Sequence, residues 1–151
     1  MACASPAYLA QHVTPATPQD LIAHEWLTQE GRRRAVDEWI GRDGARHRIR
    51  VRNRITSNNQ LSLKQLTLAG FGLSLQVLPE IAEELADGRL VQVLPDFSLA
   101  PLPVNVLLPG RGRQSAKVRC TVDALASYFA DATERARRLT RPSSGRQNGP
   151  L

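Results

Sequence analysis

Several residue types are scarce in these 151 residues, and each scarcity excludes a class of protein. Only two cysteines occur, Cys3 and Cys120, without a Cys-x-x-Cys spacing, which excludes a disulfide-rich secreted scaffold. No apolar run approaches the ~20 residues of a membrane-spanning helix. The first residues do not contain a basic segment followed by a long apolar one, so we do not expect a signal peptide. A chain of this length buries roughly two-thirds of its unfolded surface and folds without a metal or disulfide framework. We therefore expect one domain in a reducing cytoplasm.

Catalytic motifs are also missing from the chain. It contains no G-x-S-x-G elbow, P-loop or G-x-G-x-x-G sequence. His12, His24 and His47 are scattered, without ligand spacing to one another or to cysteines and carboxylates, so we expect surface or capping roles rather than metal binding. The two cysteines are interpreted as small packing residues rather than nucleophiles. We predict that the chain is not an enzyme and that it has no cofactor and no metal.

Lysine is nearly absent, and the basic charge of the chain comes from arginine. Of 20 basic residues only Lys64 and Lys117 are lysines, and the formal net charge is +6. The excess lies in two blocks, residues 32–54 and 110–151, each with a net charge of +6, whereas the segments before and between them carry −3 each. Clustered arginines attract phosphate groups or acidic surfaces. The alternative is an ordinary solvated surface, and this is the interpretation that the sequence favours.

Capping and turn residues predict alternating helices and strands. Ser5-Pro6 and Thr17-Pro18 each begin a short helix, because a hydroxyl N-cap before proline is typical of a helix start. Longer helices are expected after Ser57-Asn58-Asn59, ending at Gly70, and over 79–86. The expected strands cover residues 25–28, 71–77, 90–94 and 104–108, with a strand or loop at 35–41 and a loop at 95–103.

A row of arginines alternates with apolar residues from Arg46 onward. This period of two predicts one half-buried strand from residue 46 to residue 55. One face would carry Arg48, Arg50, Arg52 and Arg54, and the other Ile49, Val51 and Ile55. A charged row of this kind also prevents pairing between sheet edges, which explains it without a ligand.

The longest predicted helix begins at Ser115 and has an apolar stripe. The stripe is typical of a helix that packs by one face, so we expect it to be docked. Its members are Val118, Val122, Leu125, Phe129, Ala132 and Ala136. Residues 139–151 have neither periodicity nor apolar content, and we expect a disordered tail there.

Strands that alternate with helices predict an α/β domain with a largely parallel sheet. Ligands of such sheets bind at the carboxyl ends of the strands, near helix N-termini. Thr28, Gln29 and the segment Ser57-Asn58-Asn59 are expected at these ends. The latter segment suits a carboxylate or another small anion, and the alternative is an ordinary N-cap that satisfies its own helix. Local sequence alone favours the ordinary N-cap.

The order of four segments resembles the effector-binding domain of LysR-type transcriptional regulators. The segments read ASPAYLAQHVTPATPQDLIAHEWL, RITSNN, LAGFGLSLQVLPEIAEELADGRLVQVLPDF and KVRCTVDALASYF. The resemblance implies an α/β fold similar to type II periplasmic binding proteins, with two subdomains around an effector cleft. It also implies that residues 1–138 form a partial effector domain. Within it, 8–107 would be the complete second subdomain and 108–138 the return to a first subdomain that is largely missing. A helix-turn-helix is absent from these residues.

By this resemblance, Thr28, Gln29, Ser57, Asn58 and Asn59 are the expected effector-binding residues. The implied function is sensing of a small, anionic metabolite, such as a carboxylate, to control transcription. The implied partners are the effector, and a second copy or a full-length relative. DNA would be bound only through a helix-turn-helix outside this chain, and no membrane is involved.

Two other functions remain open from the sequence. One is a stand-alone interaction fragment that binds a full-length relative through the helix 115–138. The other is a nucleic-acid-associated protein that uses the two arginine blocks, although an aromatic content of 5% argues against a platform for base stacking.

Overall fold

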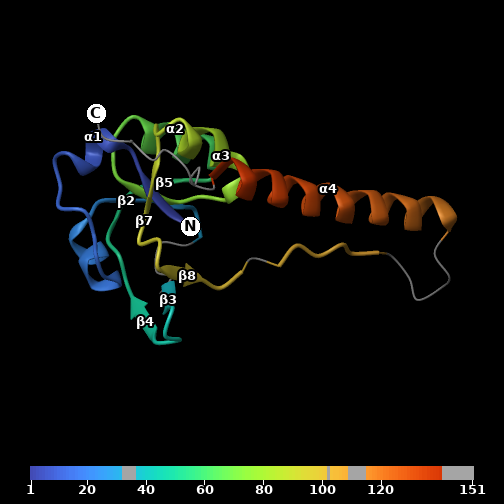
Figure 1. The fold of residues 1–151 in the computed structure, drawn as a ribbon, viewed down its shortest axis with the longest axis horizontal. Coiled ribbons are helices and arrows are strands. Elements are labelled where there is room, and N and C mark those ends of the chain that lie inside the picture. The colour runs from blue at the N-terminus through green and yellow to red at the C-terminus, as the bar shows by residue number, and fades with distance from the viewer. Residues whose placement is uncertain (32–36, 102, 109–114, 141–151) are drawn as a thin grey trace, which may run out of the picture.

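The computed structural model describes residues 1–31, 37–101, 103–108 and 115–140. Figure 1 shows a body of two small sheets with short helices, from which one long helix projects. The strands are β1 (Ala2–Ala4), β2 (Trp26–Gln29), β3 (Asp37–Gly41), β4 (Arg46–Ile49), β5 (Asn53–Ser57), β6 (Leu73–Leu75), β7 (Val91–Val93) and β8 (Phe97–Leu99). The helices are α1 (Pro6–Leu9), the 3₁₀ helix η1 (Pro18–Ala23), α2 (Gln60–Leu68), α3 (Leu78–Ala86) and α4 (Ala116–Thr140). The fold is therefore mixed α/β, as predicted.

The larger sheet has five strands in the order β5-β2-β6-β1-β7. β2 runs parallel to β5 and β6, whereas β1 runs antiparallel to β6 and β7. The expectation of a largely parallel sheet was therefore wrong, since half of these pairings are antiparallel. β1 has only three residues, Ala2, Cys3 and Ala4, all fully buried between its two neighbours. Three small residues show no periodicity, so the sequence does not reveal this central strand.

The two cysteines lie in different environments. Cys3 is buried in β1, and desolvation raises the pKa of its thiol to about 11. It acts as a small packing residue, as predicted. Cys120 is exposed on α4, so the same prediction was wrong for Cys120. The burial of each cysteine depends on packing against distant segments, so it cannot be predicted from local sequence.

The smaller sheet is antiparallel, with the order β4-β3-β8. It divides the arginine row: β4 belongs to this sheet, whereas β5 pairs with β2 in the larger one. The predicted single strand 46–55 was therefore wrong, because Arg50–Arg52 are outside both strands. The expected loop 95–103 contains β8, while no strand forms over the expected 104–108.

Helix starts follow the predicted capping chemistry. Ser5 Oγ accepts a hydrogen bond from the Tyr8 amide at the start of α1. Thr17 and Asp20 form a capping box at the start of η1, which is a 3₁₀ rather than an α-helix. α2 ends before Gly70, whose φ of 83° is a left-handed conformation that glycine adopts without strain.

α4 touches the body mainly at its C-terminal end, where it packs on α3 (Figure 1). Ala136 is 1% exposed there, whereas Leu125 and Phe129 of the same stripe are 43% and 49% exposed. The prediction of a stripe docked along its length was therefore wrong. The helix contains residues 139 and 140, where the tail was expected to begin, and 141–151 lie outside the described residues.

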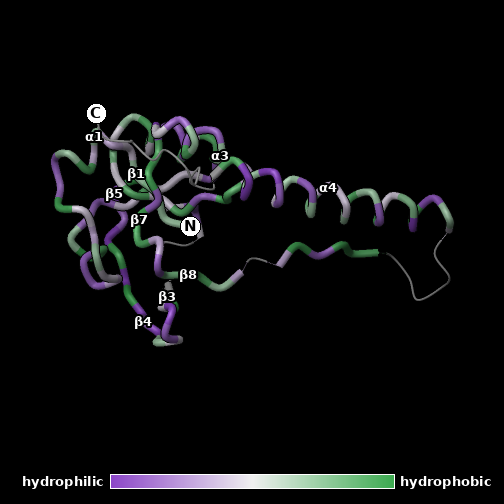
Figure 2. Tube along the Cα trace, viewed as in Figure 1, coloured by the Kyte–Doolittle hydropathy of each residue, from purple (hydrophilic) through white to green (hydrophobic). Residues whose placement is uncertain are grey.

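We call α4 together with the segment 103–108 the exposed arm. Its apolar residues are visible in the hydropathy colouring of Figure 2. The segment 103–108 runs outward from β8, whereas the chain of α4 runs back toward the body, and Leu107 is 91% exposed. Within the part of the chain that the structure describes, no helix combines the length and apolarity needed to cross a membrane. α4 reaches 25 residues, but charged residues interrupt its sequence.

Candidate functional site

A cavity of about 820 Å³ lies between the two sheets. Its wall includes residues of β2, β6 and β7 from the larger sheet and of β3 and β8 from the smaller one. Rings come from Trp26, Trp39 and Phe97, and amide groups from Gln29, Gln60 and Gln76. Apolar walls with a few placed polar groups are the usual composition of a small-molecule site.

Thr28 and Gln29 line this cavity from β2. The Thr28 hydroxyl is buried and has no hydrogen-bond partner among the described residues, and the same holds for the indole N–H of Trp39 on the opposite sheet. Buried polar atoms are normally paired, and an unpaired one in a binding cavity calls for an explanation, such as a ligand or water. Two of the five predicted site residues are thus on the cavity wall.

Ser57, Asn58 and Asn59 are not among the residues that line the cavity. The Asn59 side chain accepts hydrogen bonds from the amides of Leu61 and Ser62, at 2.9 and 3.2 Å, as the N-cap of α2. The Ser57 hydroxyl accepts from the Asn59 amide at 3.1 Å. Both side chains therefore serve their own turn and helix. Asn58 is exposed, and in the described chain its side chain makes no hydrogen bond.

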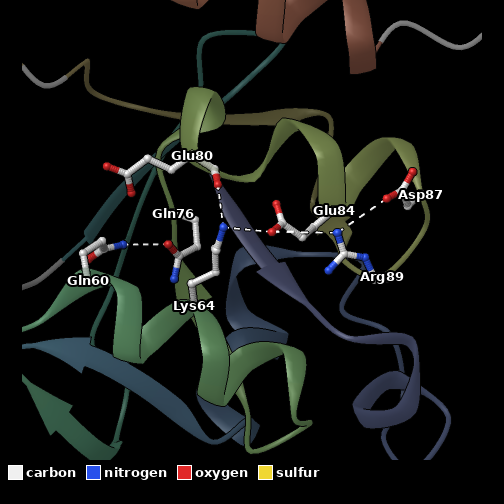
Figure 3. Close-up of polar contacts among 7 residues, drawn as sticks. All are labelled: Gln60, Lys64, Gln76, Glu80, Glu84, Asp87 and Arg89. Atoms are coloured by element: carbon white, nitrogen blue, oxygen red, sulfur yellow. Dashed lines mark hydrogen bonds and ion pairs between the residues drawn. The ribbon is translucent and has the colours of Figure 1, made fainter.

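A chain of hydrogen-bonded polar side chains leads from the half-buried Gln60 on the cavity wall to three buried residues. The Gln60 Nε2 group donates to Gln76 Oε1 at 2.7 Å (Figure 3). It also donates to the Leu75 carbonyl oxygen at 3.1 Å. Gln76 Nε2 donates to Ser74 Oγ at 2.9 Å, and 2.7 Å separates Ser74 Oγ from Thr67 Oγ1. We call Gln60, Gln76, Ser74 and Thr67 the polar relay. Sequence reasoning missed the relay, because it joins helix α2 to strand β6 through side chains rather than through a motif.

Glu38 is the carboxylate on the cavity wall, and two arginines neutralise it. Arg46 Nη1 and Arg48 Nε donate to its two oxygens at 3.0 and 3.1 Å across the β3–β4 pair. Arg42 pairs with Asp96 at 2.6 Å. Part of the arginine-rich block therefore has carboxylate partners within the chain.

A further ion pair connects α2 and α3 (Figure 3). Lys64 Nζ lies 2.8 Å from Glu84 Oε1 and also donates to the Glu80 carbonyl oxygen at 3.0 Å. Burial alone would raise the pKa of Glu84, but the hydrogen bond from Lys64 and the charges of Lys64 and Arg89 outweigh it, so the pKa lies below its ordinary value. This pair holds two helices together and does not line the cavity.

His12 and His24 gather around Tyr8. The Tyr8 ring stacks on His12 at 4.1 Å between centroids, and its hydroxyl lies 3.2 Å from His24 Nδ1. Burial, together with the nearby His12, lowers the pKa of His24. His24 is buried rather than on the surface, and it is the C-cap residue of η1, so the capping alternative of its prediction is confirmed. Among the residues described, no group of three side chains could hold a metal ion.

The comparison with known proteins identifies the class of this domain. The family model of the LysR substrate binding domain matches residues 1–130. The chain is 37% identical over 130 residues to the HTH-type transcriptional regulator DmlR of Escherichia coli, and the match covers 85% of this chain and 42% of the relative. It is 33% identical over 134 residues to the regulator PtxR of Pseudomonas aeruginosa, covering 85% of this chain and 41% of the relative. The chain belongs to the LysR substrate-binding domain family.

Solved structures agree with this family. The full-length Vibrio cholerae virulence activator AphB superposes with a TM-score of 0.60 at 27% identity, over 66% of this chain and 34% of AphB. The effector domain of AmpR from Pseudomonas aeruginosa gives a TM-score of 0.58 at 19% identity, over 89% of this chain and 63% of that domain. The predicted periplasmic-binding-protein-like fold is confirmed, and this chain covers part of the domain. It spans about two fifths of the length of the curated relatives named above.

Proposed function

We propose that this chain is the effector-sensing part of a LysR-type transcriptional regulator and that the cavity between its two sheets holds the effector. The observation that carries the proposal is the wall itself, where rings, amides and an unpaired buried hydroxyl surround about 820 Å³ at the carboxyl end of β2. In open α/β sheets, ligands bind at the carboxyl ends of the strands. Family membership supports a sensing role rather than a catalytic one.

The output of such a sensor is a change in the population of two domain arrangements. An effector shifts that equilibrium only by the difference between its affinities for the two states. DNA would be contacted by a helix-turn-helix outside these residues, in the cytoplasm, while the present chain supplies the cavity between its two sheets.

The proposed effector is a small molecule that carries an anionic group, a carboxylate in the simplest case. The start of α2 supports the anion, since the positive end of the helix dipole lies at the segment Ser57-Asn58-Asn59, even though Asn59 already accepts the amide protons of Leu61 and Ser62. Asn58 is the member of this segment whose side chain is not used by the turn or the cap. The cavity wall would hold the uncharged part of the molecule through Thr28 and Gln29.

A thermal-shift screen tests the proposal. A panel of small carboxylates and uncharged metabolites is added to the chain, and we expect some members to raise the melting temperature. Thr28→Val and Gln29→Ala should reduce that shift, because both side chains line the cavity. Asn58→Ala should reduce the shift for carboxylates only. Lack of any shift across the panel, or shifts that the two β2 variants leave unchanged, would remove the cavity from consideration.

The exposed arm, α4 with segment 103–108, favours a second role as an interaction surface. Leu107 and Phe129 expose apolar area that water disfavours. We propose that the rest of an effector domain covers it, either from chain beyond these residues or from a full-length relative. Co-purification of this chain with a tagged full-length relative, and its loss on Phe129→Asp, would support this interaction. If as much of the Phe129→Asp variant co-purifies with the relative as of the wild type, the arm is not the interaction surface.

A further inference from the structure

In each hydrogen bond of the polar relay, the donor and the acceptor can be assigned, because a backbone carbonyl oxygen accepts at each end of the relay. At the inner end, the Thr67 hydroxyl donates its proton to the Leu63 carbonyl oxygen at 2.7 Å. It must therefore accept from Ser74, whose oxygen in turn accepts from Gln76 Nε2. This places the nitrogen of the Gln76 amide toward Ser74 and its oxygen toward Gln60.

The contacts of Gln60, at the end of the relay on the cavity wall, give the same orientation of the Gln76 amide independently. A carbonyl oxygen only accepts hydrogen bonds, so the Gln60 atom 3.1 Å from the Leu75 carbonyl oxygen must be its nitrogen. The second proton of that nitrogen goes to Gln76 Oε1 at 2.7 Å. A flipped Gln60 amide would set oxygen against oxygen at both contacts. The relay therefore permits one orientation of each amide (Figure 3).

This orientation decides what Gln60 presents to the cavity it lines. Both protons of Nε2 are used inside the protein, so the group that remains for a ligand is the acceptor Oε1. We propose that the cavity selects ligands that bring a hydrogen-bond donor, a hydroxyl or an amide N–H, to Gln60 Oε1, and that Gln60 is a specificity-determining residue. The proposal rests on the proposed function, because it assumes that this cavity is the effector site.

A fixed acceptor rejects a ligand that lacks a donor, since the acceptor then loses its water without gaining a partner. Gln60 cannot adapt by rotation, because turning its amide would break two hydrogen bonds within the protein. The rings of Trp39 and Phe97 on the same wall favour an apolar or aromatic body for the ligand. The expected class is thus a small apolar or aromatic molecule that carries a hydroxyl or amide donor, whatever else it carries.

Two fragment probes test the donor requirement directly. Benzyl alcohol donates a hydrogen bond, whereas benzyl methyl ether has the same ring and an oxygen that only accepts. Protein-observed NMR titrations of the whole chain measure both dissociation constants. We expect benzyl alcohol to bind about fivefold tighter, the worth of one net hydrogen bond. Equal binding, or tighter binding of the ether, would overturn the donor requirement while leaving the cavity as a binding site. If neither probe binds the cavity, the proposed function fails together with this inference.

A matched pair of variants assigns the preference to Gln60. Gln60→Leu should bring the ratio of the two dissociation constants close to one, with the ether bound as in the wild type. Gln92→Leu removes an amide from the same cavity outside the relay and should keep the wild-type ratio. The ratio is read within one variant, so a loss of stability does not imitate the effect. A fivefold preference that survives Gln60→Leu would show that another residue sets it.

Discussion

Lys64 of α2 and Glu84 of α3 form an ion pair with 2.8 Å between Nζ and Oε1, and their side chains are only 17% and 10% exposed. The pair connects the two helices (Figure 3). Both helices lie against the larger sheet, whose strands line the cavity. Removal of Lys64 would leave the sheltered Glu84 carboxylate with Arg89, which lies 3.9 Å away and is half exposed, as a weaker compensating charge.

We therefore predict that Lys64→Met lowers the free energy of unfolding by about 2 kcal/mol, which urea denaturation at pH 7 would measure. Arg42→Met is the control, because its pair with Asp96 is 2.6 Å long but largely exposed. Pairs in water contribute little, so this variant should unfold almost as the wild type does. Equal effects of both variants would contradict the argument from burial.

Two substitutions on α4 separate its docked end from its exposed part. Ala136→Asp places a charge in the contact with α3 and should cost about 3 kcal/mol of stability. Phe129→Asp should change the stability of this chain by less than about 0.5 kcal/mol, because half of the ring is in water. Thermal unfolding measures both. A large loss on Phe129→Asp would mean that the arm packs on something in solution.

Gly72 lies in a place where no side chain fits. A Cβ atom at this position would overlap the Glu25 carbonyl oxygen, which accepts the Leu73 amide proton at the start of β6. We predict that Gly72→Ala costs about 3 kcal/mol, since the backbone must move. Gly88→Ala is the control: its φ is 72°, but a Cβ atom meets nothing within 4 Å. There we expect only the cost of a left-handed alanine, about 1 kcal/mol. Comparable losses in urea denaturation would contradict the steric argument.

Local chemistry made the helix starts predictable. Ser5, Thr17 and the segment before α2 cap as their side chains suggest, because a cap involves only residues that are close in sequence. The alternation of Arg46 to Ile55 was misleading for the opposite reason. An extended backbone keeps its period of two through a break, so the pattern does not show that one half pairs with β3 and the other with β2.

The candidate site was predictable only in part, for the same physical reason. Thr28 and Gln29 follow from the rule that ligands meet the carboxyl ends of strands, and they line the cavity. Gln60 and Gln76 gain their importance from a hydrogen bond across 16 positions of sequence, and Gln76 also from its burial beside Ser74. No spacing rule encodes such a contact, and only the packing of α2 on β6 reveals it.

His24 makes the stability of the domain depend on pH. Burial is the main cause that lowers its pKa, and the nearby His12 adds to it, while Asp20 acts in the opposite direction. In the unfolded chain, His24 takes up a proton near its ordinary pKa of 6.5, before the folded protein does. The unfolded state therefore binds more protons as the pH falls through 6.5, and stability decreases until the pH passes the lowered pKa of the folded state.

Urea midpoints measured from pH 7.5 to pH 5 test this prediction against His24→Gln, which keeps a polar partner for the Tyr8 hydroxyl but does not titrate. We expect the wild type to lose stability relative to this variant below about pH 6.5, the ordinary histidine pKa. A stability difference between the wild type and His24→Gln that is constant across the range would show that His24 protonates equally in both states, and burial would then not govern its titration.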